Sequence, residues 1–179
     1  QGIAGRGRDA FAAVGALALL PAHPDATVVI CGSCQPADES YRVAMQEKIE
    51  KAGLAERIRF IGEQPFEALP GLFQGMSIVA ALSRHEGFGL TPLEAMASGC
   101  AVLTSRAGAW PDIVKEGSTG YTTATGDLDD IKAKLAVLLS DPTLVEAMGG
   151  AGRRLAEEQY TVEREAQALT DYLLGLAAE

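Results

Sequence analysis

Short apolar runs alternate with longer segments of helical period along most of the chain. The runs cover residues 27–31, 58–61, 77–82, 101–104 and, more weakly, 120–123. Apolar runs of this length are typical of strands buried on both faces, and their alternation with helices is typical of repeated βα units. The pattern therefore predicts an α/β fold, a Rossmann-like doubly wound parallel sheet with helices on both faces.

The predicted helices are delimited by capping residues, by proline and by glycine. They cover residues 9–20, 40–52, 66–74, 91–98, 127–139, 141–160 and 161–176. Pro70 interrupts the third of them, Asp141 before Pro142 is a favourable start for the sixth, and Thr161 opens the last. Because no strand is predicted after residue 123, the chain is predicted to end in a helical tail.

Composition narrows the class of protein. The 179 residues, 47% of them hydrophobic, suit one domain with a sizeable core, predicted to span residues 1–179. A formal net charge of -9 leaves no basic face for a phosphate backbone, so no nucleic acid is expected as a partner. No apolar run approaches the roughly 20 residues of a membrane span and no secretory leader opens the chain, so we expect a soluble protein.

The cysteines raise a second interpretation. Cys31, Cys34 and Cys100 are odd in number, which favours a reducing cytosol over a disulfide scaffold. Cys31-Gly-Ser-Cys34 has the spacing of a thiol oxidoreductase motif, and this function stays open as an alternative. The other interpretation of Cys31 is the last buried residue of a strand. Without a second pair of ligands, no metal site is expected.

The loop that follows residues 77–82 combines glycines with two carboxylates. Ligands of parallel sheets bind at the carboxyl ends of the strands, and Gly87 and Gly89 let a ligand approach this loop closely. Thr91-Pro-Leu-Glu94 has the form of a capping box, which is one explanation of Glu94. Glu86 has no such explanation, and a loop carboxylate there is well placed to accept hydrogen bonds from sugar hydroxyls.

These residues resemble a known family. EGFGLTPLEAMASGCAV, from Glu86 to Val102, is similar to the E-x7-E signature of the family-four retaining glycosyltransferases, which have the GT-B fold. Residues 53–62 (GLAERIRFIG), 107–114 (AGAWPDIV) and 117–121 (GSTGY) resemble further segments of that family in the same order. The form of the motif is most similar to bacterial mannosyltransferases of lipopolysaccharide core assembly.

The resemblance implies the C-terminal half of a GT-B fold, which binds the nucleotide-sugar donor and transfers a hexose with retention. Glu86 would hold the donor sugar as the catalytic residue, and Glu94 would bind the ribose. The other donor-binding residues that it implies are Gly87, Phe88, Gly89, Leu90, Thr91, Gly32, Gly62 and Glu63. GDP-mannose or a UDP-sugar would be the substrate, with no cofactor and no metal.

Two departures from the family limit the resemblance. In the family, an Arg and a Lys that bind the diphosphate follow the first strand of the domain. Here no apolar strand precedes Gly5, and Arg6 and Arg8 are the only basic residues close to it in the sequence. We therefore expect a domain truncated at its N-terminus, with Arg84 and Arg106 as the other available cations.

The second departure is the missing N-terminal acceptor domain, without which the chain would bind donor and transfer nothing. The last helix would belong beside that domain. The full-length enzyme is expected in the cytoplasm, with peripheral association at the inner face of the membrane. A non-catalytic nucleotide-binding module of the same fold is the remaining alternative.

Overall fold

The computed structural model describes residues 2–5, 15, 18–33 and 39–177. In this part of the chain, six parallel strands form one sheet in the order β3-β2-β1-β4-β5-β6. Their bounds are β1 (Gly2–Gly5), β2 (Thr27–Cys31), β3 (Ile58–Gly62), β4 (Ile78–Ala81), β5 (Ala101–Ser105) and β6 (Gly120–Thr123). This order is that of a doubly wound dinucleotide-type sheet, so the predicted fold class is confirmed.

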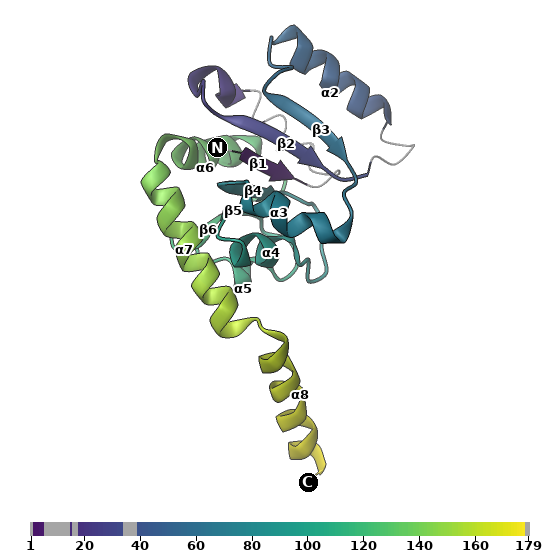
Figure 1. Cartoon of the computed structure of the whole chain (residues 1–179), viewed down its shortest axis with the longest axis vertical. Helices are drawn as coiled ribbons and strands as arrows, with labels where there is room; N and C mark the ends of the chain where they lie inside the picture. The colour runs from purple at the N-terminus through teal and green to yellow at the C-terminus, as the bar shows by residue number, and fades with distance from the viewer. Residues whose placement is uncertain (1, 6–14, 16–17, 34–38, 178–179) are drawn as a thin grey trace.

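Helices follow the strands along the chain (Figure 1). They are the 3-10 turns η1 (Leu20–Ala22) and η3 (Phe66–Ala68), and the helices α2 (Glu39–Lys51), α3 (Leu69–Gln74), α4 (Thr91–Ala97), α5 (Trp110–Ile113), α6 (Leu128–Ser140), α7 (Pro142–Gln159) and α8 (Val162–Ala177). The helix predicted over residues 9–20 lies mostly outside the described residues. The helix predicted over residues 66–74 is the 3-10 turn η3 followed by α3. Pro70 is the second residue of α3 and does not interrupt it, because proline fits the first turn of a helix.

The prediction that no strand precedes Gly5 is wrong. Gly2–Gly5 forms β1 in the middle of the sheet, paired with β2 on one side and with β4 on the other. Its sequence, Gly-Ile-Ala-Gly, is too short and too rich in glycine to stand out as an apolar run. Hydrogen bonding to a strand on each side compensates for the low intrinsic strand propensity of this sequence.

Two apolar layers cover the two faces of the sheet. Alternate residues of β4 point to opposite faces, so Ile78 and Ala80 belong to one layer and Val79 and Ala81 to the other. Helices α2 and α6 contribute to the first layer, whereas α3, α4 and α5 contribute to the second. The strands are thus buried on both faces, which explains their nearly continuous apolar sequences.

Helix α7 packs closely on α4 because it presents glycines there. A Cβ added to Gly149 would lie 2.0 Å from the carbonyl oxygen of Gly99, and one added to Gly152 would lie 3.1 Å from Cγ of Met96. Asp141 caps α7 by accepting a hydrogen bond from the amide of Leu144 at 2.9 Å, as its position before Pro142 predicts. The small residues therefore let α7 approach both α4 and the turn that follows it.

Strand β6 at the edge of the sheet is stabilised by hydrogen bonds and an ion pair of Glu116. Glu116 accepts hydrogen bonds from the amide of Thr122 at 2.7 Å and from its hydroxyl at 2.9 Å, and Nζ of Lys134 lies 3.1 Å from Oε1 of Glu116. Partial burial raises the pKa of Glu116, but the Thr122 and Lys134 hydrogen bonds and the Lys134 charge outweigh it, so the pKa is lowered overall.

Helix α8 projects away from the rest of the domain (Figure 1). It begins where the sequence predicts, with Oγ1 of Thr161 accepting a hydrogen bond from the amide of Arg164 at 3.3 Å. Its large apolar side chains are exposed: Val162, Leu169, Tyr172, Leu173, Leu174 and Leu176. The helical tail is confirmed, and it contributes nothing to either buried layer.

Candidate functional site

The loops at the carboxyl ends of the strands meet at one edge of the sheet, as parallel topology requires. The amide of Gly32 donates a hydrogen bond to the carbonyl of Gly62 at 2.9 Å, which joins the loops after β2 and β3. Both glycines have positive φ, at 139° and 68°, so these turns favour a residue without Cβ. Glu63 follows Gly62 and is exposed. The structure thus brings three of the predicted residues to the ligand edge.

The loop of residues 83–90 carries most of the predicted site and is largely exposed. Glu86 is exposed, and its Oε1 accepts a hydrogen bond from Oγ of Ser83 at 3.1 Å. Phe88 and Leu90 are 52% and 57% exposed, so both side chains are accessible from solvent. An added Cβ at Gly87 would meet no described atom within 4 Å, so the space beside its backbone is open.

The loop between β5 and α5 packs beneath this glycine-rich loop. Nε1 of Trp110 donates a hydrogen bond to the carbonyl of Gly89 at 3.0 Å, and the amide of Ala109 donates one to the carbonyl of Gly87 at 3.3 Å. Gly89 has φ of 70°, in the left-handed region that favours glycine, whereas Gly87 does not have positive φ. The exposed loop is therefore anchored through its backbone.

The predicted capping box at the start of α4 is wrong. Leu90 is the N-cap residue and already has helical φ and ψ, and no side chain accepts the capping hydrogen bond. Thr91 is the first helical residue, and its side chain is buried with those of Pro92 and Leu93. Thr91 therefore does not occupy the N-cap position that the capping box requires.

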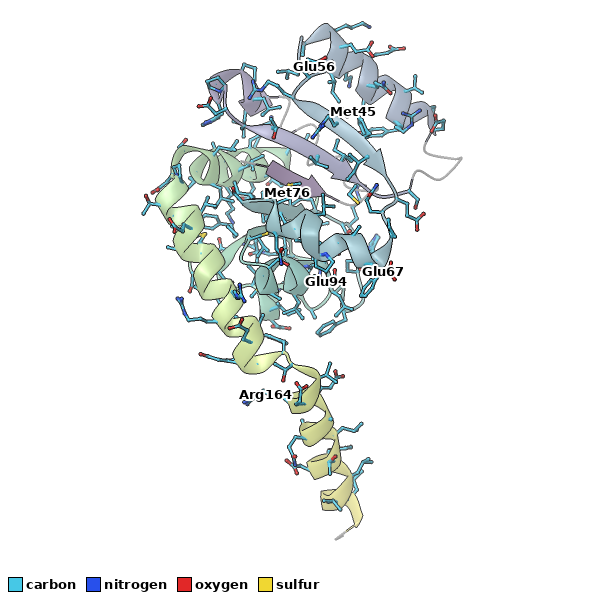
Figure 2. The ribbon with its side chains drawn as sticks, viewed as in Figure 1. Met45, Glu56, Glu67, Met76, Glu94 and Arg164 are labelled. Carbon is cyan, nitrogen blue, oxygen red and sulfur yellow. The ribbon has the colours of Figure 1, made fainter. Side chains whose placement is uncertain are left out.

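Glu94 therefore lies in the first turn of α4 without a capping role, and it lines a groove beside the helix. The groove has a volume of about 350 Å³. It is lined by Phe66, Leu69, Pro70, Phe73, Gln74, Glu94, Ala97, Ser98 and Arg153, which come from η3, α3, α4 and α7. Phe66 at one end is 74% exposed. Figure 2 shows Glu94 on the same part of the molecule as Glu67 of η3, with Glu56 at the far end of the domain.

Four arginines are candidates for the cations of the site, and the structure describes two of them. Arg6 and Arg8 lie outside the described residues. Arg84 and Arg106 are exposed in the loops that follow β4 and β5. Nε of Arg106 lies 3.5 Å from Oγ1 of Thr122, so this side chain leans toward β6.

Cys31 ends β2 and is buried, which agrees with the second interpretation given to it, and Cys34 lies outside the described residues. Burial raises the pKa of Cys100 to about 11, and its thiol lies 3.1 Å from the carbonyl of Phe73. Cys100 is therefore a core residue rather than a reactive thiol.

No three His, Cys, Asp or Glu side chains among the described residues lie close enough to hold a metal ion. None of the helices described is both long and apolar enough to cross a membrane.

The groove and the contacts of Phe66 and Trp110 were not predicted from the sequence. In the sequence, Phe66 looks like one of the buried apolar residues of a short helix. Only its exposure in the structure shows that it is not a core residue. Trp110 is the only tryptophan of the chain and follows two small residues, which was a signal for a close contact. Its partner, Gly89, is 21 residues earlier, so no local pattern could identify it.

The parallel sheet, with its strand order and the glycine-rich loops at the carboxyl ends of its strands, defines a Rossmann-like doubly wound α/β domain. Residues 9–155 match the family described as Glycosyl transferases group 1. Because the match spans most of the chain, the chain belongs to this family.

The relatives and structures are consistent with that assignment. The chain is 36% identical over 151 residues to the lipopolysaccharide core biosynthesis mannosyltransferase LpcC of Rhizobium leguminosarum bv. viciae, covering 84% of this chain and 42% of that protein. It is similar to the crystal structure of the C-terminal domain of LpcC, a group 1 glycosyl transferase of Francisella tularensis, with a TM-score of 0.84, 34% identity and coverage of 90% and 86%. Anabaena Alr3699/HepE in complex with UDP has the same fold, with a TM-score of 0.81, 21% identity and coverage of 97% and 48%. The chain thus spans less than half the length of the LpcC relative.

Proposed function

We propose that this chain is the donor-binding half of a retaining hexosyltransferase, which binds a nucleotide sugar at the ligand edge of its sheet. One observation carries the proposal: Glu86 and Glu94 lie on either side of the start of α4, one in an exposed loop and one beside a groove. A carboxylate is a strong acceptor for the hydroxyls of a sugar or a ribose. The spacing of the two suits a ligand that carries hydroxyls at both ends.

The nucleoside end of the donor is proposed to lie beside Glu94. The groove next to it offers apolar walls from Leu69, Pro70 and Phe73, and the exposed ring of Phe66 stands at its end. Nucleobases stack on aromatic rings, whereas ribose hydroxyls need an acceptor such as Glu94. The 350 Å³ of the groove can accommodate a nucleoside.

The sugar end is proposed to lie over the glycine-rich loop. Glu86 would hold sugar hydroxyls, and the open space beside Gly87 would admit the sugar against the backbone. The amides of Phe88 to Thr91 would face the sugar and the diphosphate. Gly32, Gly62 and Glu63 would border the cleft on its other side, with Arg6 or Arg8 as the cations.

The reaction proposed breaks the bond between C1 of the sugar and the diphosphate oxygen, and forms a bond from C1 to an acceptor hydroxyl on the same face. The proton of the acceptor hydroxyl passes to the leaving diphosphate. Negative charge develops on that diphosphate, so fixed N–H groups and cations beside it would supply most of the acceleration. No metal is needed for this scheme.

The acceptor would be bound by an N-terminal domain outside this chain. The relative from Rhizobium leguminosarum extends well beyond the matched region, which supports a second domain. The exposed apolar side chains of α8 are proposed to be covered by that domain in the longer protein. The whole enzyme would act in the cytoplasm, at the inner face of the membrane, and the 179 residues alone would transfer no sugar.

Calorimetric titration tests the proposal. We expect binding of GDP-mannose, the first donor to try because the relative is a mannosyltransferase. Comparison of GDP with UDP, which differ only in the base, then identifies the preferred base. Glu86→Gln and Glu94→Gln should each weaken binding about tenfold to a hundredfold, because each removes a charged hydrogen-bond acceptor.

Glu56→Gln is the matched control. Glu56 is an exposed carboxylate two residues before β3, at the end of the strands opposite the site, and Figure 2 shows it far from Glu94. Its replacement should leave affinity unchanged. Equal affinities of the Glu86 and Glu94 variants and the wild type would contradict the proposed site, and the absence of binding by any nucleotide sugar would contradict the proposed function.

A further inference from the structure

We infer that Trp110 is a positioning residue that fixes the sugar-binding half of the donor site without touching the donor, an inference that rests on the proposed function. Trp110 is the first residue of α5 and only 1% exposed, so it lies beneath the site and not in it. Its effect on a ligand must therefore pass through the loop that it contacts.

The first contact is the hydrogen bond of the indole. Nε1 of Trp110 donates to the carbonyl of Gly89 at 3.0 Å. The two residues are also in close steric contact, because a Cβ added to Gly89 would lie 2.5 Å from Nε1 and 2.9 Å from Cε2. The indole thus fixes both the position and the orientation of the Gly89 peptide group.

The second contact comes from the two residues before Trp110. The amide of Ala109 donates to the carbonyl of Gly87 at 3.3 Å, and a Cβ added to Gly108 would lie 2.1 Å from that same oxygen. Gly87 and Gly89 are therefore both held from below, on either side of Phe88. Glu86, whose carbonyl oxygen would lie 2.7 Å from the same added Cβ, precedes this anchored segment directly.

The contact acts on one half of the site. The groove proposed for the nucleoside is lined by residues of η3, α3, α4 and α7, and the loop of residues 105–110 contributes none of them. Loss of the indole hydrogen bond should therefore affect the sugar more than the nucleoside. A role limited to core packing would weaken both equally, or neither.

Trp110→Phe tests this distinction, because phenylalanine keeps an aromatic ring and removes the N–H donor. We expect its affinity for GDP-mannose to fall about tenfold, as the loss of one buried hydrogen bond predicts. Its affinity for GMP, which lacks both the sugar and the β-phosphate and so probes the nucleoside end alone, should change less than twofold. The quantity that decides is the ratio of the two Kd values, measured by calorimetry together with the midpoint of thermal unfolding.

Two further variants separate positioning from packing. Ile113→Val removes one methyl group from the same helix and the same buried layer, so it should lower the unfolding midpoint slightly and leave the Kd ratio unchanged. Gly89→Ala disturbs the contact from the loop side. It should lower the GDP-mannose affinity selectively even if Trp110→Phe fails to fold.

Fluorescence gives a signature that packing alone would not produce. Trp110 is the only tryptophan, so all indole emission of the chain reports on the contact with Gly89. GDP-mannose should change the emission of the wild type, and GMP should change it little.

The outcomes are distinct. Equal losses of GDP-mannose and GMP affinity in Trp110→Phe, or no loss of either, would overturn the positioning role while leaving the proposed function intact. If the wild type binds neither ligand nor UDP-glucose, the proposed function fails, and the inference fails with it.

Discussion

The glycine-rich loop of residues 83–90 and helix α4 are consecutive in the chain but are held in opposite ways. Helix α4 is fixed by side chains, since Leu93, Ala95 and Met96 are buried between the sheet and α7. The loop exposes Glu86 and Phe88, and its contacts with the residues below are made by its backbone. Both regions contribute to the candidate site.

The difference shows how a protein can keep a binding loop exposed and still well positioned. Buried apolar side chains stabilise α4 through the hydrophobic effect, which is strong, but the side chains buried in this way are not free to meet a ligand. In the loop, close contacts at Gly89 and Gly108 replace side-chain burial, so the side chains stay available. The two regions should therefore respond to different substitutions.

The largest expected effect is that of Gly108→Ala on the loop. The added Cβ would lie 2.1 Å from the carbonyl oxygen of Gly87, and Gly108 has φ of 53°, which alanine rarely adopts. We expect a loss of about 2–4 kcal/mol in the free energy of unfolding and loss of donor binding. Gly87→Ala, which meets open space, should leave the free energy of unfolding within about 1 kcal/mol of wild type in urea denaturation.

The next effect concerns α4, through α7. Gly149→Ala places Cβ 2.0 Å from the carbonyl of Gly99, so α7 must move away and the free energy of unfolding should fall by about 1–3 kcal/mol. Gly150→Ala, one residue later in the same helix, meets only the flexible end of Arg154 at 3.6 Å and should stabilise by about 0.5–1 kcal/mol. Equal effects at the two positions would refute the close packing of α7.

These contrasts bear on how much the sequence predicts. The strands from β2 onward and the C-terminal helices follow from apolar runs and capping residues, because their burial and their caps are local properties. Strand β1 was missed because its pairing is not local, and the capping box failed because the burial of Thr91 depends on the packing of α4. The motif located Glu86 and Glu94, but Phe66 and Trp110 depend on contacts between distant segments.

A smaller effect is expected from acid at the edge strand β6, outside both regions. The pKa of Glu116 is lowered in the folded protein, so its ionised form stabilises the fold at pH above the ordinary value of 4.5. That contribution is lost as the pH falls through the lowered pKa. Glu116 is half exposed, so we expect less than about 1 kcal/mol, seen as a weaker decline of stability between pH 5 and pH 3 in Glu116→Gln.

The smallest effect should come from removing α8. Its side chains are exposed, so truncation after Tyr160 should change the free energy of unfolding of the 179-residue chain by less than about 0.5 kcal/mol. Thermal unfolding of the two lengths compares them directly. A large loss in the free energy of unfolding would mean that α8 stabilises this domain. That result would contradict the absence of α8 side chains from both buried layers.

The central strand has a consequence for the mechanics of the sheet. Strand β1 is matched with β2 at four positions but with β4 at only two, Ile3 with Ile78 and Ala4 with Val79. The loops of Gly32 and Gly62 lie on one side of this shorter pairing and the glycine-rich loop on the other. A ligand bound to both sets of loops would therefore bridge the two halves of the sheet, and amide hydrogen exchange along β1 and β4 would measure its effect on this pairing.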